Sequence, residues 1–259
     1  MPDDTYTHGH HASVLQSHNK RTVENSAAYL IPHLVPGASV LDVGCGVGTI
    51  TLEIGQRVAP GRVVGIDVSA DFMPEAADNV TFEVGDAYAL GYHDDTFDVV
   101  HAHQVLQHVS DPVAALREMR RVVKPEGVVA VRDADYAAMS WWPPDPRLDR
   151  WQEIYRAVAY QNDAEPDAGR RLLDWATKAG FGEITPSSDT WTFAVPEDRA
   201  WWSDTWATRT TSSDLAHQAL DYGLTTPDEL ADLADGWRAW GAYPTSWWAV
   251  LHGQLLCRH

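Results

Sequence analysis

Short apolar runs alternate with segments of helical periodicity from about residue 36 to residue 135, and this alternation limits the possible folds more than any other feature. The apolar runs predict strands at residues 39–44, 62–69, 80–90, 97–109 and 127–135, the fourth running on into a loop or helix. The segments between them predict helices at residues 49–59, 71–78 and 112–123, the second interrupted by Pro74. Strands separated by helices form βαβ units, whose parallel sheet is covered on both faces and binds ligands at the carboxyl ends of its strands.

The composition is that of an ordinary globular protein. Of the 259 residues, 44% are hydrophobic and 22% are charged. The formal net charge of −18 disfavours binding to nucleic-acid phosphates or to an anionic membrane. The N-terminal residues do not have the pattern of a secretory signal, and no apolar run is long enough to span a membrane. Cys45 and Cys257 form no spaced pair. We therefore expect a cytoplasmic protein without membrane insertion, a nucleic-acid partner or a disulfide framework.

A glycine-rich turn, VLDVGCGVGT at residues 40–49, joins the first predicted strand to the first predicted helix. Gly44, Gly46 and Gly48 stand at alternate positions, so the backbone can approach a ligand without a Cβ in the way. This spacing is not the GxGxxG of dinucleotide-binding proteins, which weakens an NAD interpretation. Asp67, at the end of the second strand, is placed to accept hydrogen bonds from both ribose hydroxyls of an adenosine. With VGDA after the third strand, these features favour a nucleoside cofactor over a plain turn followed by a helix cap.

These motifs resemble those of the class I S-adenosylmethionine-dependent methyltransferases, particularly the ubiquinone/menaquinone-biosynthesis type. VLDVGCGVGT matches the family's first motif, GIDVS the acidic second, and VGDAYALGYHDDTFDVVHAHQVLQHVSDP the third and fourth. The resemblance covers about residues 29–131, and KAGFGEI at residues 178–184 precedes the family's sixth strand. It implies an α/β, Rossmann-like fold, in which a seven-stranded, mostly parallel sheet has helices on both faces. It also implies S-adenosylmethionine as the cofactor.

The resemblance further implies which residues bind this cofactor. They lie just after the first four strands: Asp42, Gly44, Gly46, Asp67, Val68, Asp86, Ala87, His103 and Gln104. Asp42, Gly44 and Gly46 of the first motif would line the methionine part of the cofactor. After the second strand, Asp67 would hold the ribose and Val68 would pack on the adenine. The acid of the third motif would accept the exocyclic amine of the adenine. The pair after the fourth strand would lie under the sulfonium end.

The amino-terminal arm is expected to form one or two amphipathic helices from residue 12 onward and to close over the cofactor as a lid. Tyr6 and His18 are candidates for contact with the substrate. Arg21 is a candidate for a bidentate contact with the carboxylate of the cofactor, with a solvated helix face as the alternative. The HGHH sequence at residues 8–11 has no carboxylate partner nearby and fits no zinc spacing, so we expect no metal site.

A histidine near the transferred methyl group is able to act as a general base. His103 is the candidate, because it stands at the end of the fourth predicted strand. The alternative is transfer without a base, since the alignment of nucleophile, methyl carbon and sulfur supplies much of the acceleration.

The second half of the chain differs in composition, because all 12 tryptophans lie after residue 140. We expect one domain, 1–259, with a core at about 29–135, 166–195 and 244–259. The remaining segments, 1–28, 136–165 and 196–243, are expected to form a helical cap over the carboxyl edge of the sheet. Candidate substrate-binding residues in the cap are Trp141, Trp202, Arg209 and His217. A tightly packed cap, a homodimer surface and an aromatic cage for a cation are alternatives for the rings. The last strand, at 246–258, is expected at an antiparallel edge.

The sequence therefore predicts methyl transfer from S-adenosylmethionine to an oxygen, nitrogen or carbon atom of a small aromatic or apolar molecule. Two alternatives stay open: an NAD(P)-dependent oxidoreductase, and a non-catalytic cofactor-binding protein on the same scaffold.

Overall fold

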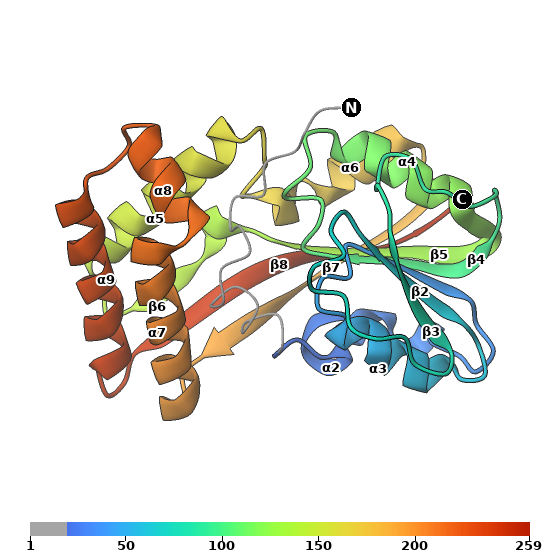
Figure 1. Ribbon diagram of the computed structural model, residues 1–259, viewed down its shortest axis with the longest axis horizontal. Coiled ribbons are helices and arrows are strands. Elements are labelled where there is room, and N and C mark those ends of the chain that lie inside the picture. The colour runs from blue at the N-terminus through green and yellow to red at the C-terminus, as the bar shows by residue number, and fades with distance from the viewer. Residues whose placement is uncertain (1–19) are drawn as a thin grey trace.

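A twisted, mostly parallel sheet with helices on both faces forms one half of the molecule (Figure 1). The computed structural model describes residues 20–259. The strands are β1 (Val40–Val43), β2 (Val63–Asp67), β3 (Val80–Val84), β4 (Phe97–His103), β5 (Val123–Ala134), β6 (Ser140–Trp142), β7 (Glu183–Phe193) and β8 (Trp247–Arg258). The α-helices are α2 (Val23–Ser26), α3 (Thr49–Val58), α4 (Pro112–Val122), α5 (Pro146–Gln161), α6 (Leu172–Ala179), α7 (Pro196–Ser212), α8 (Asp214–Asp221) and α9 (Pro227–Ala242). Short 3₁₀ helices are η1 (Ala28–His33), η2 (Tyr136–Ala138) and η3 (Ala168–Arg170).

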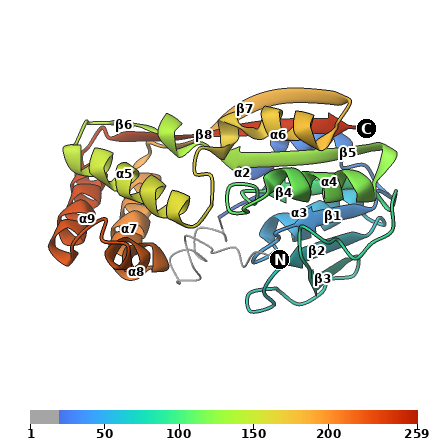
Figure 2. The same ribbon diagram turned by 90° about the horizontal axis from the view of Figure 1, so that it is seen from above.

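The sheet has eight strands in the order β3-β2-β1-β4-β5-β8-β6, with β7 on the other side of β8 (Figure 2). Strands β1 to β5 are parallel to their neighbours, whereas β8 is antiparallel to β5, β6 and β7. The predicted α/β class and parallel sheet are confirmed. The expected seven strands are one too few, because the three-residue strand β6 continues the line of β5 along the first residues of β8. The last strand is not at an edge, because β7 pairs along its other side.

Each face of the sheet has its own apolar core. Helices α4 and α6 contribute Leu116, Met119 and Trp175 to one core. On the opposite face, α2, η1 and α3 contribute residues such as Leu30 and Ile54. The expected helix at 71–78 is absent, because Pro74 in its middle has no N–H for a helical hydrogen bond and the segment is too short to form without it. Strand β5 begins at Val123, earlier than expected, and its register with β4 shifts there, because residues 124–127 of β5 lie opposite Asp98 alone.

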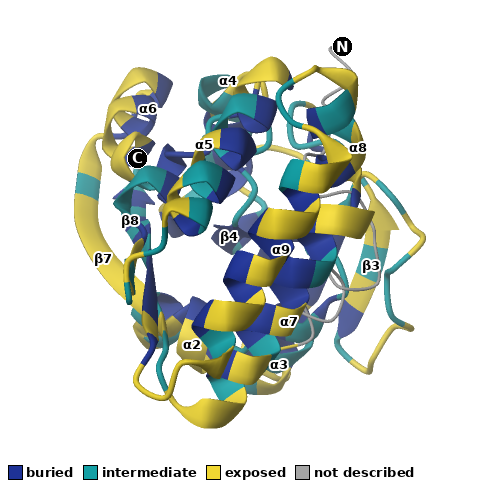
Figure 3. Cartoon of the chain, turned by 90° about the vertical axis from the view of Figure 1, so that its left-hand side faces the viewer, coloured by how far each residue is buried: buried dark blue, intermediate teal, exposed yellow. Residues whose placement is uncertain are grey.

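The helices expected to form a cap make a third core beside the sheet, seen on the left in Figure 1. We call the part formed by β6, α5, α7, α8 and α9 the helical lobe. The tryptophan rings pack against one another inside it, and Trp237 lies 4.8 Å from Trp151 and 4.5 Å from Trp248 between ring centroids. Figure 3 shows that α7 and α9 turn buried faces inward and exposed faces to solvent. Thr226 caps α9 by accepting a hydrogen bond from the Glu229 backbone N–H.

Several ionisable side chains are buried on the face of the sheet beneath α2 and η1. His103 pairs in register with Arg132, which pairs with Gln254, and His252 lies two residues away on β8. Burial, followed by the positive charges of Arg21 and Arg132, holds the pKa of His103 well below its ordinary value. Burial lowers the pKa of His252 in the same way. Both rings are therefore neutral in the folded protein at pH 7.

Replacing Trp237, which is fully buried, by alanine is expected to lower the free energy of unfolding by about 3–5 kcal/mol. Trp247→Ala is the matched control, because this ring is 39% exposed, and its effect should stay below about 1 kcal/mol. Urea unfolding of the three proteins measures the difference. Equal losses for the two variants would show that the lobe core does not depend on the stacked rings.

The buried histidines predict acid lability. An unfolded histidine binds its proton near pH 6.5, whereas folded His103 does so only at lower pH, so its contribution to stability is present above pH 6.5 and is lost as the pH falls below that value. His103→Gln should therefore reduce the slope of unfolding free energy against pH by up to about 1.4 kcal/mol per pH unit. The buried carboxyl of Asp133 has the opposite effect on this slope, because burial raises its pKa to about 7. That effect is the same in the wild-type protein and in the His103 variant. Urea unfolding between pH 7.5 and 4.5 tests this, and identical slopes would contradict it.

Candidate active site

The glycine-rich turn lies between β1 and α3 at the carboxyl edge of the sheet. Gly44, Gly46 and Gly48 have φ values of 72°, 52° and 71°, in the left-handed region that favours glycine. A Cβ on Gly44 would also lie 2.4 Å from a methyl carbon of Val105. The backbone N–H groups of Gly44 and Cys45 donate to the carbonyl of Ile66 on β2. The turn is thus held open against β2 and touches the loop that follows β4.

Asp67 ends β2 directly beside this turn. Its Oδ2 accepts a hydrogen bond of 2.9 Å from the backbone N–H of Gly46, and its Oδ1 accepts one of 3.4 Å from that of Ser69. The side chain is half-buried, while the neighbouring Val68 is 75% exposed. A carboxylate and an apolar side chain are therefore presented together at the end of one strand.

Asp86 and Ala87 lie in the loop after β3. The Asp86 carboxylate accepts a hydrogen bond of 2.8 Å from the backbone N–H of Tyr88, and a bridge between Asp86 and Ala89 closes the turn. Ala87 packs against the core beneath α4 and α6. This loop stands at the same edge of the sheet as Asp67, because β2 and β3 are parallel neighbours.

Asp42 lies beneath the turn and has partners for both oxygens. Oδ2 accepts a hydrogen bond of 2.5 Å from the hydroxyl of Thr51, and Oδ1 is 2.7 Å from Nδ1 of His101. The residue is only 3% exposed. Its carboxylate thus joins β1, α3 and β4 and supports the turn from below, and the expectation that Asp42 lines the cofactor stays a prediction.

Gln104 follows β4 and has a φ of 55°, which is unusual for a residue other than glycine. Its Oε1 accepts a hydrogen bond of 2.6 Å from Arg21. Its amide nitrogen is 2.9 Å from Nε2 of His252, whose Nδ1 is 3.0 Å from the carbonyl of Val250. Because a carbonyl only accepts, Nδ1 of this neutral histidine carries the proton and Nε2 accepts from Gln104. The amide orientation of Gln104 is thereby fixed.

His103 does not reach the place expected of a catalytic base. It is 5% exposed, and neither ring nitrogen makes a hydrogen bond within residues 20–259. Its ring centroid lies 5.7 Å from that of Trp191 and 6.3 Å from that of His252. Since side chains alternate along a strand, His103 points into the face of the sheet, and Gln104 is the residue that reaches the cavity described next.

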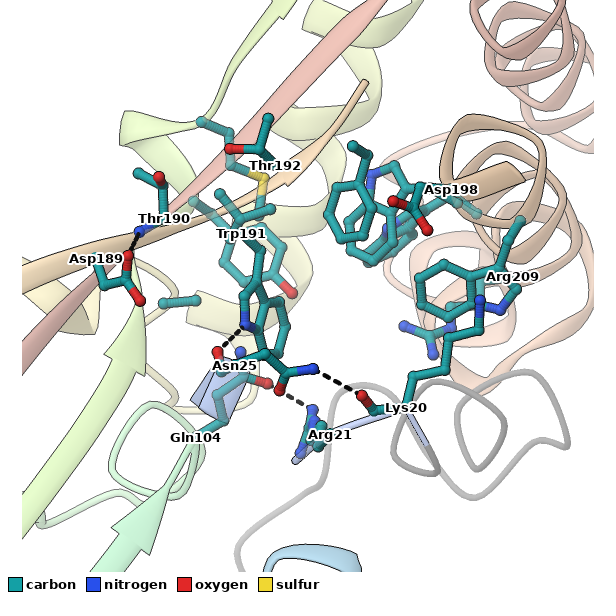
Figure 4. Close-up of a pocket in the computed structure, with 18 residues that line it drawn as sticks. Lys20, Arg21, Asn25, Gln104, Asp189, Thr190, Trp191, Thr192, Asp198 and Arg209 are labelled. Atoms are coloured by element: carbon teal, nitrogen blue, oxygen red, sulfur yellow. Dashed lines mark hydrogen bonds between the residues drawn. The ribbon is translucent and has the colours of Figure 1, made fainter. Parts of the chain in front are cut away.

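A cavity of about 370 Å³ lies between the helical lobe and the sheet (Figure 4). Its wall comes from widely separated parts of the chain: α2 and the residues before it, the residue after β4, the end of β5 with the following η2, strands β7 and β8, and one face of α7. The residues that line it are Lys20, Arg21, Asn25, Gln104, Ala134, Tyr136, Met139, Asp189, Thr190, Trp191, Thr192, Phe193, Asp198, Trp201, Trp202, Trp206, Arg209 and Val250. Half of these residues are aromatic or apolar, five are charged, and the other four are polar without charge.

The structure brings some of the expected residues to this cavity and leaves others away from it. Arg21, Gln104, Trp202 and Arg209 line it. Trp141 is stacked on Trp248 instead, with 4.6 Å between ring centroids, because β6 and β8 are paired at this point. Exposed His217 is also absent from the lining. Tyr6, His18 and the HGHH sequence lie outside the described residues.

Sequence analysis did not single out Trp191, although this side chain is at the centre of the cavity wall in Figure 4. Its Nε1–H donates a hydrogen bond of 2.6 Å to the backbone carbonyl of Asn25. The signal was present in the alternation of β7, which places Asp189, Trp191 and Phe193 on one face of the strand. Phe193 stacks on Trp202 of the lobe, with 4.1 Å between centroids.

Within residues 20–259, no three histidine, cysteine or acidic side chains converge closely enough to hold a metal ion. None of the helices in that same part of the chain is both long and apolar enough to cross a lipid bilayer. Cys45 and Cys257 are both free thiols, and burial raises the pKa of each.

Comparison with known proteins gives the family. Residues 34–184 match a family model described as a methyltransferase domain. An uncharacterised methyltransferase of Schizosaccharomyces pombe is 31% identical, over 97% of this chain and 95% of that protein. The ubiquinone/menaquinone biosynthesis C-methyltransferase UbiE of Bdellovibrio bacteriovorus is 37% identical over 37% of this chain and 43% of its own length. A phosphoethanolamine N-methyltransferase of Haemonchus contortus, solved with S-adenosylhomocysteine, has a TM-score of 0.53 at 17% identity, covering 86% of this chain and 49% of that one.

The family model covers more than half of the chain, and the relative from Schizosaccharomyces pombe aligns along nearly all of it. These matches confirm the resemblance seen in the motifs and leave the oxidoreductase alternative without support. The chain therefore belongs to the class I methyltransferases, with S-adenosylmethionine as its cofactor.

Proposed function

We propose that the enzyme methylates a small molecule bound in the cavity between the lobe and the sheet, and that the cofactor binds along the carboxyl edge of β1 to β4. The observation that carries this proposal is the position of Gln104. It belongs to the cavity wall, and the next residue, Val105, touches the glycine turn. The donor and acceptor regions therefore meet at the end of β4.

The residues at this edge suit S-adenosylmethionine, which supplies an electrophilic methyl group on a sulfonium sulfur. Three glycines without Cβ atoms leave the backbone accessible to the methionine part. The Asp67 carboxylate is suited to accept hydrogen bonds from the ribose hydroxyls. The exposed side chain of Val68 is suited to pack on the adenine. We propose that the Asp86 carboxylate accepts a hydrogen bond from the exocyclic amine of the adenine and that Ala87 lies beside this contact. Arg21, at the junction of the two regions, is the candidate for the carboxylate of the cofactor.

The chain contributes to the reaction mainly by orientation and by excluding water. The rings of β7 and α7 hold the acceptor against the end of β4, so that its nucleophilic atom faces the methyl carbon. The new bond forms at that carbon as the bond to sulfur breaks, with the electron pair left on sulfur. No histidine of the described residues lines the cavity, and its carboxylates are those of Asp189 and Asp198. Alignment, rather than proton abstraction by His103, is the proposed source of rate acceleration.

We also propose that residues 1–259 act as one domain and that the acceptor is not a nucleic acid. Strand β8 contributes Trp248 to the lobe core and Leu255 to the sheet core, so the two parts share a structural element. The excess of acidic residues, 37 against 19 lysines and arginines, supports a small-molecule acceptor.

Asp67→Asn should weaken binding of S-adenosylhomocysteine by roughly 10- to 100-fold, because the amide keeps the shape of the carboxylate but loses the charge that strengthens hydrogen bonds to the ribose. Calorimetric titration of the full chain measures this change. Asp71→Asn is the matched control in the same loop, since this residue is exposed. Wild-type affinity in the Asp67 variant would contradict the assignment of the ribose site.

Trp201→Ala should raise the KM for the acceptor by roughly tenfold or more, because a half-buried ring is removed from the cavity wall. Affinity for S-adenosylhomocysteine should be unchanged, since this ring lies on α7, away from the glycine turn. Trp142→Ala serves as the control, because that ring is 54% exposed and does not line the cavity. An unchanged KM for Trp201→Ala would place the acceptor elsewhere.

A further inference from the structure

Positively charged side chains gather around the cavity, and each lies over the face of a tryptophan. Lys20, Arg21 and Arg209 line the cavity, and Arg132 lies beneath Trp191. The distances from the charged group to the ring centroid are 4.1 Å for Lys20 and Trp201, 5.9 Å for Arg21 and Trp191, 4.9 Å for Arg132 and Trp191, and 5.0 Å for Arg209 and Trp206. Three tryptophans of the cavity wall, Trp191, Trp201 and Trp206, are thus each in contact with a cation of the chain itself.

This arrangement runs against the charge of the molecule as a whole, which is −18. Two carboxylates, those of Asp189 and Asp198, also line the cavity. Among the described residues that line the cavity, the three cations Lys20, Arg21 and Arg209 outnumber them by one. Charges inside a cavity with apolar walls act more strongly than charges on an open surface, because water screens them less. The described part of the cavity wall therefore carries more positive than negative side chains, in a protein that is acidic as a whole.

Arg132 strengthens this conclusion. It is fully buried, and none of its three guanidinium nitrogens makes a hydrogen bond to a residue in the range 20–259. Burial lowers its pKa to about 10, so that it remains charged at pH 7. A buried charge is costly unless something compensates it, and the Trp191 ring, which separates Arg132 from the cavity, supplies part of that compensation.

The same pairs argue against a cationic acceptor. An aromatic cage binds a cation through the negative faces of its rings. Here the faces of Trp191, Trp201 and Trp206 already carry cations of the chain itself. A second cation in the cavity would share those faces and meet like charges.

We propose that the methyl acceptor is a planar molecule with an anionic oxygen group, a carboxylate or an ionised phenol, and that Arg209 binds this group. The inference rests on the proposed function and names the class of its substrate. Arg209 is 5% exposed and enters the cavity from α7, whereas Gln104 lies on the opposite side, as Figure 4 shows. The anionic group would lie at the lobe end and the reacting atom at the Gln104 end, with the ring between them among the tryptophans.

Three one-ring probes of similar shape test the charge preference: 4-hydroxybenzoate, 4-hydroxybenzamide and 4-hydroxybenzylamine. Calorimetric titration of each is carried out at pH 7 on the full chain saturated with S-adenosylhomocysteine. We expect the carboxylate to bind roughly tenfold or more tightly than the neutral amide, and the amine to bind weakest. In Arg209→Met the ratio between carboxylate and amide should fall to near one, and in Arg209→Lys part of it should remain. Because each ratio compares two probes within one protein, a general loss of stability does not imitate the result.

Arg238→Met is the matched control, because this arginine is exposed on α9 and pairs with Asp235 at the surface. It should keep the full preference for the carboxylate. Equal binding of the three probes, tighter binding of the amine, no binding by any probe, or a preference that survives Arg209→Met would each overturn the inference. Failure of the proposed function is seen separately, as loss of S-adenosylhomocysteine binding by the wild-type chain.

Discussion

The hydrogen-bonded ladder of β8 holds the molecule together. One end of this strand carries Trp248 and Val250 into the lobe core, and the other carries Leu255 and Cys257 into the sheet core. Along its length it pairs with β5, β6 and β7. Close contact with η3 depends on Gly253, since a Cβ there would lie 2.0 Å from the carbonyl oxygen of Gly169. The lobe is thus a continuation of the sheet.

This continuity fixes the geometry of the active site. The glycine turn and Asp67 depend on the short parallel strands β1 and β2, whereas the cavity depends on β7 and α7, which follow much later in the chain. Gln104 meets both regions, and its amide is oriented by His252 of β8. The strand that joins the two cores therefore also positions the residue at which the donor and acceptor regions meet.

The parts of the fold that could be predicted from the sequence are those encoded by local patterns. The alternation of apolar runs indicated the parallel sheet, and the glycines with Asp67 indicated the cofactor. The contact of Asp42 with His101 could not be predicted, because the two residues are 59 apart in the chain and no local pattern reveals a contact of that kind. Strand β6 was missed because three residues carry too little periodicity to detect. The cavity could not be assembled from the sequence, since its wall combines segments far apart in the chain whose proximity depends on tertiary packing.

The segment before α2 is attached to the rest of the cavity wall quite differently from the lobe. Arg21 is hydrogen-bonded to Gln104, and the Lys20 ammonium lies 4.1 Å from the centroid of the Trp201 ring. Each of these contacts contributes at most about 3 kcal/mol, whereas moving the lobe would break the strand ladder of β8 and two apolar cores. Moving the segment would therefore break fewer of the described contacts than moving the lobe, because the sheet and the lobe share β8 as one frame.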